Sequence, residues 1–191
     1  MRIRMLAISA VVAMVLQGCA GTGAVMSPAQ RQGLQSLQLF SAEASPRFTF
    51  YLACTSDSVN CVTIENAFNE WANDRHVTMR AVDPNDASFS AGQPSRPADQ
   101  GAPYRLAVHY VPWMSSGMTV TSLDKQGGSY PPVVGYSATI QVFDSATGKL
   151  LQTLPVRAQQ TADSNKGPAN PYLRAEVRDF LANLDPVPAH P

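Results

Sequence analysis

The pattern that most limits the fold is an alternation of apolar and polar residues that leads into one tight turn. Every second residue is apolar along residues 134–142, and residues 150–158 return on the other side of the segment DSATG at 144–148. This arrangement predicts a β-hairpin whose first strand buries one face. Pro155 lacks an amide hydrogen, which predicts an edge or an irregularity in the returning strand.

A β-α-β pattern occupies residues 47–82. Residues 48–54 alternate with period two, which predicts a strand with one core face. Residues 60–75 change to helical spacing, with Asn60 in the N-cap position. The apolar face of this helix consists of Ile64, Ala67, Phe68 and Trp71. Residues 76–82 alternate again and predict a second strand.

The rest of the chain supplies a long loop and four shorter elements. Residues 83–103 hold four prolines and few apolar side chains, which marks a loop. The other expected elements are a third strand over residues 104–111, a turn over 112–118 (PWMSSGM), a short fourth strand over 118–123, and a final helix that Asn170-Pro171 begins and Asp185-Pro186 ends.

Together these elements predict an α/β (α+β) fold. We expect a two-layer sandwich, in which two helices cover one face of a mixed, mostly antiparallel sheet of four to six strands. The single globular domain is expected over residues 47–185, with a C-terminal tail over residues 186–191. A mature chain of about 170 residues is long enough for one domain with a substantial core.

Residues 1–18 have the features of an export signal peptide. Arg2 and Arg4 give a basic start, and residues 5–16 form an uncharged apolar run. The run has the size of a signal h-region and is too short to cross a bilayer of about 30 Å comfortably. We therefore expect this segment to be processed and not to remain as a transmembrane helix.

The end of the signal resembles the lipobox of bacterial lipoproteins, which is a leucine, a variable residue and a small residue before a cysteine. Here these residues are Leu16, Gln17, Gly18 and Cys19. The resemblance implies that Cys19 takes a diacylglycerol, that the chain is cut before it, and that the new amino terminus is acylated, with palmitate as an expected fatty acid. Ala20 follows where an aspartate would resemble an inner-membrane retention signal, so the resemblance implies the periplasmic face of the outer membrane. The alternative is an ordinary secretory signal with a chance cysteine.

Residues 19–46 are expected to be the lipidated N-terminus and a flexible tether. They are rich in Gly, Ala, Ser and Gln, although four apolar residues between positions 34 and 40 could pack locally. If Cys19 is lipidated, Cys54 and Cys61 remain in an oxidising compartment, and we favour a disulfide between them. The alternatives are two buried thiols or a redox or metal site, although their spacing does not match a CxxC motif.

A second resemblance covers the globular part. The order of the elements, the lipobox, and the stretch YSATIQVFDSATGKLLQTLPVRA (residues 136–158) before a final amphipathic helix look like the small α/β outer-membrane lipoproteins of unknown function. Members of that group typically place an aspartate-containing turn before a strand, which here corresponds to Asp144, Thr147, Gly148 and Lys149. The motif is a common hairpin turn, so the resemblance supports the fold and implies no activity.

The sequence shows no catalytic constellation, cofactor motif or nucleic-acid patch. It lacks the G-x-S-x-G and H-E-x-x-H motifs, the P-loop and the dinucleotide fingerprint. Loss of the leader would leave 12 basic against 14 acidic residues, which does not indicate nucleic-acid binding. A soft-metal site can be built from His109, Met114 and Met118, but a strand that enters a core would show the same residues. We therefore expect no enzyme, no cofactor and no metal.

The segment VPWMSSGM (residues 111–118) is the strongest candidate for a binding surface. Tryptophan and methionine are enriched at binding hot spots and adaptable apolar contacts. The predicted partner-binding residues are Trp113, Met114, Met118 and, from the neighbouring loop, Tyr130. The alternative is that Trp113 folds back and caps one end of the core.

The function that these observations favour is that of a non-catalytic periplasmic lipoprotein on the outer membrane. It would bind an envelope protein or a cell-wall component as an accessory or assembly factor. One alternative is an inhibitor or immunity lipoprotein directed against a secreted hydrolase. Others are a small envelope hydrolase, which needs convergent titratable groups in a cleft, and a lipid carrier, which needs an apolar cavity.

Overall fold

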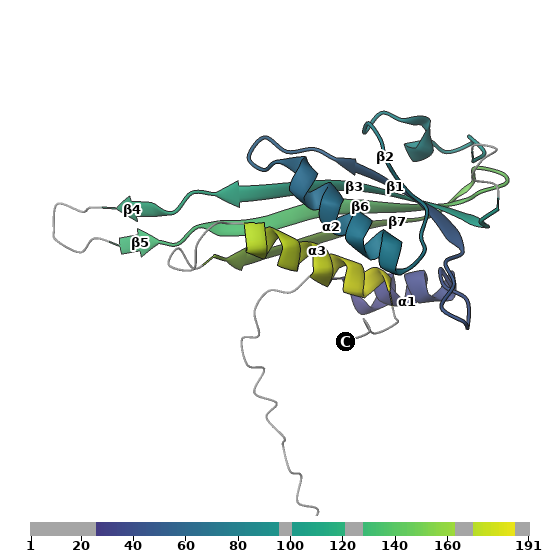
Figure 1. The fold of residues 1–191 in the computed structure, drawn as a ribbon, viewed down its shortest axis with the longest axis horizontal. Coiled ribbons are helices and arrows are strands. Elements are labelled where there is room, and N and C mark those ends of the chain that lie inside the picture. Colours follow the sequence, from purple (N-terminus) through teal and green to yellow (C-terminus); the bar gives the residue numbers. More distant parts are fainter. Residues whose placement is uncertain (1–25, 96–100, 121–127, 163–169, 186–191) are drawn as a thin grey trace, which may run out of the picture.

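A computed structural model of the chain describes residues 26–95, 101–120, 128–162 and 170–185, and Figure 1 shows their arrangement. The main sheet has five strands in the order β2-β1-β3-β6-β7. β1 is parallel to β2 and β3, while β6 is antiparallel to β3 and β7. These strands are β1 (Phe48–Cys54), β2 (Met79–Ala81), β3 (Tyr104–Ser115), β6 (Val133–Asp144) and β7 (Leu150–Thr161). A second sheet pairs β4 (Met118–Val120) with β5 (Gly128–Tyr130).

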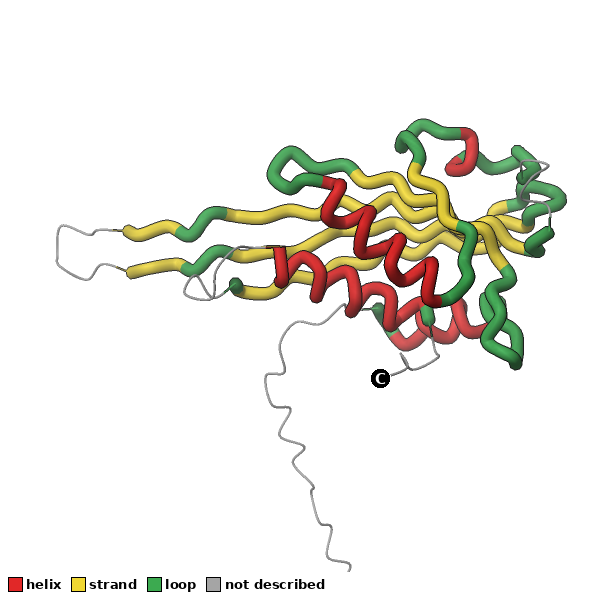
Figure 2. Tube along the Cα trace, in the orientation of Figure 1, coloured by secondary structure: helices red, strands yellow, loops and turns green. Residues whose placement is uncertain are grey.

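Helices α2 (Cys61–Asp74) and α3 (Asn170–Leu184) lie side by side on one face of the main sheet, as Figures 1 and 2 show. The Asn60 side chain caps α2 by accepting from the Val62 amide (2.9 Å). The predicted two-layer mixed sheet and its β-α-β unit are therefore confirmed. Pro155 lies on β7, an edge strand of the sheet, where a missing amide hydrogen breaks no ladder bond.

The core between the helices and the sheet is built around aromatic rings. Phe68 of α2 and Phe180 of α3 meet edge to face, with ring centroids 5.8 Å apart. Tyr110 and Tyr136 stack on each other from β3 and β6, with centroids 4.7 Å apart, and both rings contact Phe180. Such contacts add to the large apolar area that each ring removes from water, so these rings bind the two layers together.

The segment expected to be a tether is partly a helix. Helix α1 (Pro28–Ser36) begins with a capping box, in which Ser27 and Gln30 each hydrogen-bond the other's backbone amide. Leu34, Leu39 and Phe40 are buried in the main core. The Gln30 side chain also donates to the Pro155 carbonyl on β7 (3.1 Å). The prediction was thus wrong for residues 26–46, because a few apolar side chains dock a segment whose composition is that of a linker.

Two predicted features lie outside the described residues. These are Cys19 with its signal peptide, and the C-terminal tail over residues 186–191. None of the helices among the described residues has the length and apolar character that crossing a membrane requires.

The opposite face of the sheet is covered at one end by the loop that contains the 3₁₀ helix η1 (Ala87–Phe89). Arg105 of β3 is only 2% exposed beneath this loop, and its guanidinium donates to the carbonyls of Gln93 (2.6 Å) and Ser90 (2.9 Å). The same guanidinium lies over the Phe143 ring, 4.3 Å from its centroid. Burial lowers the pKa of Arg105. A buried arginine therefore fastens a loop that has few apolar side chains of its own.

Residues 112–118 do not turn the chain, so that expectation was wrong. β3 continues to Ser115, and β4 follows after two residues and pairs antiparallel with β5, which begins at Gly128. Pro112 is tolerated in the strand because β1 ends opposite Tyr110 and leaves that edge of β3 without a neighbouring strand. The Ser-Ser-Gly segment is typical of turns in composition but here only joins two extended pieces.

Candidate interaction site

The four predicted partner-binding residues all fall in one projecting hairpin. We call this hairpin the arm and define it as residues 112–120 and 128–136. Trp113 and Met114 lie on β3, Met118 on β4 and Tyr130 on β5, and the register places Met118 opposite Tyr130. Figure 2 shows the β4–β5 end of the arm well clear of the helices and of the rest of the sheet. The structure thus brings Tyr130 close to the segment 113–118, from which it is separated in the sequence.

A disulfide closes the loop beside the root of the arm. Cys54 at the end of β1 and Cys61 at the start of α2 form an S–S bond of 2.07 Å, the pairing that the sequence favoured. The bond closes the loop over residues 55–60, which would otherwise be free to open. Cross-linking so short a loop stabilises a fold by about 2–3 kcal/mol in the chain-entropy account.

The disulfide loop continues the hydrogen bonding of β1 along the exposed edge of β3. The loop forms a hydrogen bond with every second residue of β3, as a strand would. Two of the three groups that it uses are serine hydroxyls and not backbone groups. The three bonds are from the Thr55 amide to the Tyr110 carbonyl (3.1 Å), from the Ser56 hydroxyl to the Pro112 carbonyl (2.7 Å), and from the Met114 amide to the Ser58 hydroxyl (3.1 Å). We call this contact the brace, because it holds the root of the arm to the body.

Trp113 lies on the outer face of the sheet, the face away from α2 and α3. Its ring packs over Gly135 of β6, where an added Cβ would come within 2.7 Å of the indole. The residue is half-buried and does not belong to the core cluster, so the alternative in which it folds back and caps the core does not fit the structure. Met114 points to the other face and is 38% exposed.

The soft-metal alternative does not fit the strand geometry. His109 and Met114 are five residues apart on one continuous strand, so their side chains project from opposite faces. On the outer face, His109 Nε2 lies 2.8 Å from the Thr55 hydroxyl. Among the residues the structure describes, no group of three or more His, Cys, Asp or Glu side chains is placed to hold a metal ion.

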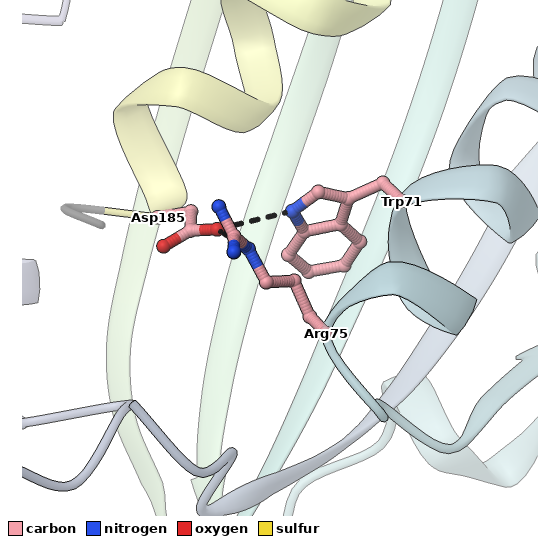
Figure 3. A network of polar contacts seen from close by, with 3 residues as sticks. All are labelled: Trp71, Arg75 and Asp185. Atoms are coloured by element: carbon pink, nitrogen blue, oxygen red, sulfur yellow. Dashed lines mark hydrogen bonds and ion pairs between the residues drawn. The ribbon is translucent and has the colours of Figure 1, made fainter. Parts of the chain in front are cut away.

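A polar network between the helices is structural. Arg75 and Trp71 of α2 both reach Asp185, just after α3, at 2.5 Å and 3.4 Å from its Oδ2 atom (Figure 3). The ion pair between Arg75 and Asp185 is largely buried. The arrangement contains no nucleophile, and its evident effect is to join the C-terminal ends of the two helices.

Glu176 of α3 is the acidic group whose pKa departs furthest from its ordinary value. Burial, followed by the negative charge of Asp179, raises its pKa to about 7, although a hydrogen bond from Gln160 opposes the shift. Burial also raises the pKa values of Tyr110 and Tyr136. Glu176 is only 3% exposed, so a substrate cannot reach its carboxyl group. Sequence analysis missed this residue because an acidic residue on a helix is ordinarily a solvated one.

A hollow of about 340 Å³ lies between α1 and the end of α3. Leu34, Leu39 and Phe40 supply apolar lining, and Arg31 and Gln35 belong to its polar lining. The lipid-carrier alternative requires an apolar cavity, whereas this hollow is near the lower end of ligand-pocket volumes and is lined by both apolar and polar side chains.

Neither a protein family nor a curated protein sequence matches this chain. Several solved structures are similar to it at low identity. A PelC dodecamer from Paraburkholderia phytofirmans is 17% identical, with a TM-score of 0.42, over 72% of this chain and 86% of that one. A putative neuraminyllactose-binding hemagglutinin homolog from Helicobacter pylori is 7% identical, with a TM-score of 0.44, over 73% and 82%. Lipoprotein GNA1162 from Neisseria meningitidis is 13% identical, with a TM-score of 0.35, over 71% and 99%. A bacterial lipoprotein is thus among the structures that this chain broadly resembles.

Proposed function

We propose that this chain is a non-catalytic lipoprotein, anchored through Cys19 to the periplasmic face of the outer membrane, whose arm binds an envelope protein or cell-wall component. It would act as an accessory or assembly factor. The observation that carries this proposal is the arm, a two-stranded extension that projects from a well-packed body (Figure 1). The signal sequence and lipobox support the location.

The arm has the form of a docking element. Among the described strands, β4 and β5 pair only with each other, so both outer edges of this small sheet are available for hydrogen bonds. A two-stranded ribbon has little stability of its own in water, and it gains from an added strand or a packed surface. The brace keeps the root of the arm aligned with the body, which lowers the entropy lost when a partner binds.

The proposal is tested by photo-crosslinking in the bacterium that makes the protein. A photo-reactive amino acid at Thr119, on β4, should give discrete adducts, while the same group at exposed Arg178 on α3 serves as the matched control. Replacing residues 117–131 with a short turn should remove binding to the partner identified from those adducts without changing the melting temperature of the body. Equal crosslinking at both positions, or unchanged partner binding by the shortened protein, would contradict an arm-centred function.

The anchor has its own test, independent of the arm. Metabolic labelling with a radioactive fatty acid should mark the wild-type chain and leave Cys19→Ala unlabelled. Equal labelling of the two proteins would remove the anchor from the proposal. The identity of the crosslinked partner separates the alternatives, because a secreted hydrolase would indicate an inhibitor or immunity protein.

A further inference from the structure

The outer face of the sheet is covered unevenly. The η1 loop packs over Tyr51, Ala107 and Phe143 at one end, where they form a small apolar cluster with Phe89. The rows nearer the arm belong to neither apolar cluster and are half-buried or exposed. We call this region the outer patch, defined by His109, Val111, Trp113, Ser137, Thr139 and Arg157.

The register of the strands places these side chains in adjacent rows. His109 is opposite Thr139 in one row, and Val111, Ser137 and Arg157 form the next. Trp113 is opposite Gly135 in the row beyond. Strands lie about 4.8 Å apart and rows about 7 Å apart, so Trp113 and Arg157 are separated by roughly 12 Å at their backbones. A ligand that contacts both residues must span that distance, so an oligomer of several rings fits better than a single small molecule.

Trp113 lies at one end of the outer patch. Its indole lies close to Gly135, and the absence of a side chain at that position permits the close approach. An aromatic ring has a negative face, which attracts the partly positive C–H groups on the flat side of a sugar ring. A tryptophan that lies along a sheet is therefore suited to stacking against a saccharide.

The charge of this face favours saccharides that carry acidic groups. Arg157 is exposed, and none of the outward-facing positions in the described strands of the main sheet carries Asp or Glu. A guanidinium pairs with a carboxylate through two parallel hydrogen bonds. The short hydroxyl of Ser137 lies between the indole and the guanidinium, and that of Thr139 lies one row further from the indole. Both can hydrogen-bond sugar hydroxyls.

We propose that the outer patch binds an oligosaccharide whose sugars carry carboxylate groups, with one ring on Trp113 and a carboxylate on Arg157. A protein partner is less well matched, because Trp113 and Val111 are the only large apolar side chains among the six residues that define the patch. The site uses a face of the sheet and not the strand edges of the arm. It therefore stands whether or not the arm binds a partner of its own.

Calorimetry of the full-length lipidated protein in detergent micelles tests the proposal, with a tetrasaccharide of uronic acids as probe and maltotetraose as its neutral counterpart. The uronate probe should bind, and the neutral probe should bind at least tenfold more weakly. Trp113→Ala should weaken uronate binding about tenfold, the scale of an aromatic contact. Arg157→Gln should weaken it severalfold, whereas Arg178→Gln on α3 is the matched control and should change nothing.

Several outcomes would overturn the proposal. These are absence of uronate binding, equal binding of the two probes, or uronate binding that survives both Trp113→Ala and Arg157→Gln. Trp113→Phe keeps an aromatic floor and should retain most of the affinity, so it separates lost stacking from damage to the fold. The protein with the shortened arm should keep full affinity for the uronate, which distinguishes failure of this site from failure of the arm. If the partner protein shields the Trp113 ring from a fluorescence quencher and the uronate probe does not, the outer patch is a protein interface and the saccharide site is refuted.

Discussion

β3 and β6 pair over twelve positions, and the two halves of this ladder have opposite surroundings. In the half nearer the η1 loop, Leu106, Val108 and Ile140 are fully buried beneath the helices. In the arm, Met114 and Ser115 are exposed, and the disulfide loop replaces the missing strand with serine hydroxyls. The half of the ladder that the helices cover thus forms part of the stable core. The half that they leave uncovered forms a projecting surface held by a few local hydrogen bonds.

The largest effect is expected in the covered half. Phe180→Ala removes the ring that joins Phe68, Tyr110 and Tyr136, so it should lower the free energy of unfolding by about 3–5 kcal/mol. Trp113→Ala, in the arm, should cost about 1 kcal/mol because its ring is half exposed. Urea denaturation of both variants measures the contrast, and equal losses would show that the arm is part of the cooperative core.

Removal of the disulfide should act on both regions. Replacing Cys54 and Cys61 with serine should lower the free energy of unfolding by about 2–3 kcal/mol, the entropy that the closed loop removes from the unfolded chain. The loop also holds the arm, so hydrogen exchange at the Met114 amide should accelerate more than exchange in the covered half. Uniform acceleration along β3 would contradict a specific role of the brace.

Glu176 gives the covered half a pH dependence. Its pKa is raised to about 7 in the folded protein, so ionisation favours the unfolded chain. Its contribution to stability is fully present below about pH 4.5, the ordinary pKa of glutamate, and is lost as the pH rises through 7. Glu176→Gln should remove this loss, so the variant should gain up to about 2 kcal/mol on wild type between pH 5 and pH 8. Parallel pH profiles of unfolding for the two proteins would show that Glu176 does not titrate in this range.

The smallest effect is expected from one hydroxyl of the brace. Ser58→Ala removes the acceptor of the Met114 amide and should change the free energy of global unfolding by less than about 1 kcal/mol. Exchange of that amide should still accelerate severalfold. Ser36→Ala, at the end of α1, removes a hydroxyl that bonds within its own helix and is the matched control. If both variants leave exchange at Met114 unchanged, the serine bond does not hold the arm.

Sequence patterns predicted the elements whose spacing is regular. The alternation in β6 and the helical spacing in α2 each reflect one buried face, and that face is what the fold requires. The arm was missed because Pro112 and Ser-Ser-Gly are typical of turns, and only the end of β1 opposite Tyr110 makes Pro112 acceptable in a strand. Helix α1 was missed because Leu34, Leu39 and Phe40 acquire their role from residues distant in the chain.

The residues of the candidate site could be named from the sequence, but their arrangement on two faces of one strand could not. Trp113 and Met114 were selected as residue types that often bind partners. Their side chains lie on opposite faces of the sheet because both belong to β3, and the sequence did not predict that this strand extends so far. The burial of Arg105 under a loop and of Glu176 between its helix and the sheet depends on contacts between distant segments. No local pattern records such contacts, because a charged residue on an amphipathic element is usually solvated.

The contact between α1 and β7 bears on how this chain behaves at high concentration. An open sheet edge is a template on which further copies can add without limit, and crowding on a surface makes such encounters frequent. At the middle of β7, Pro155 offers no amide hydrogen and its carbonyl is already occupied by the Gln30 side chain. The middle of β7 is therefore a poor template for an added strand, whereas among the described strands β4 and β5 pair only with each other.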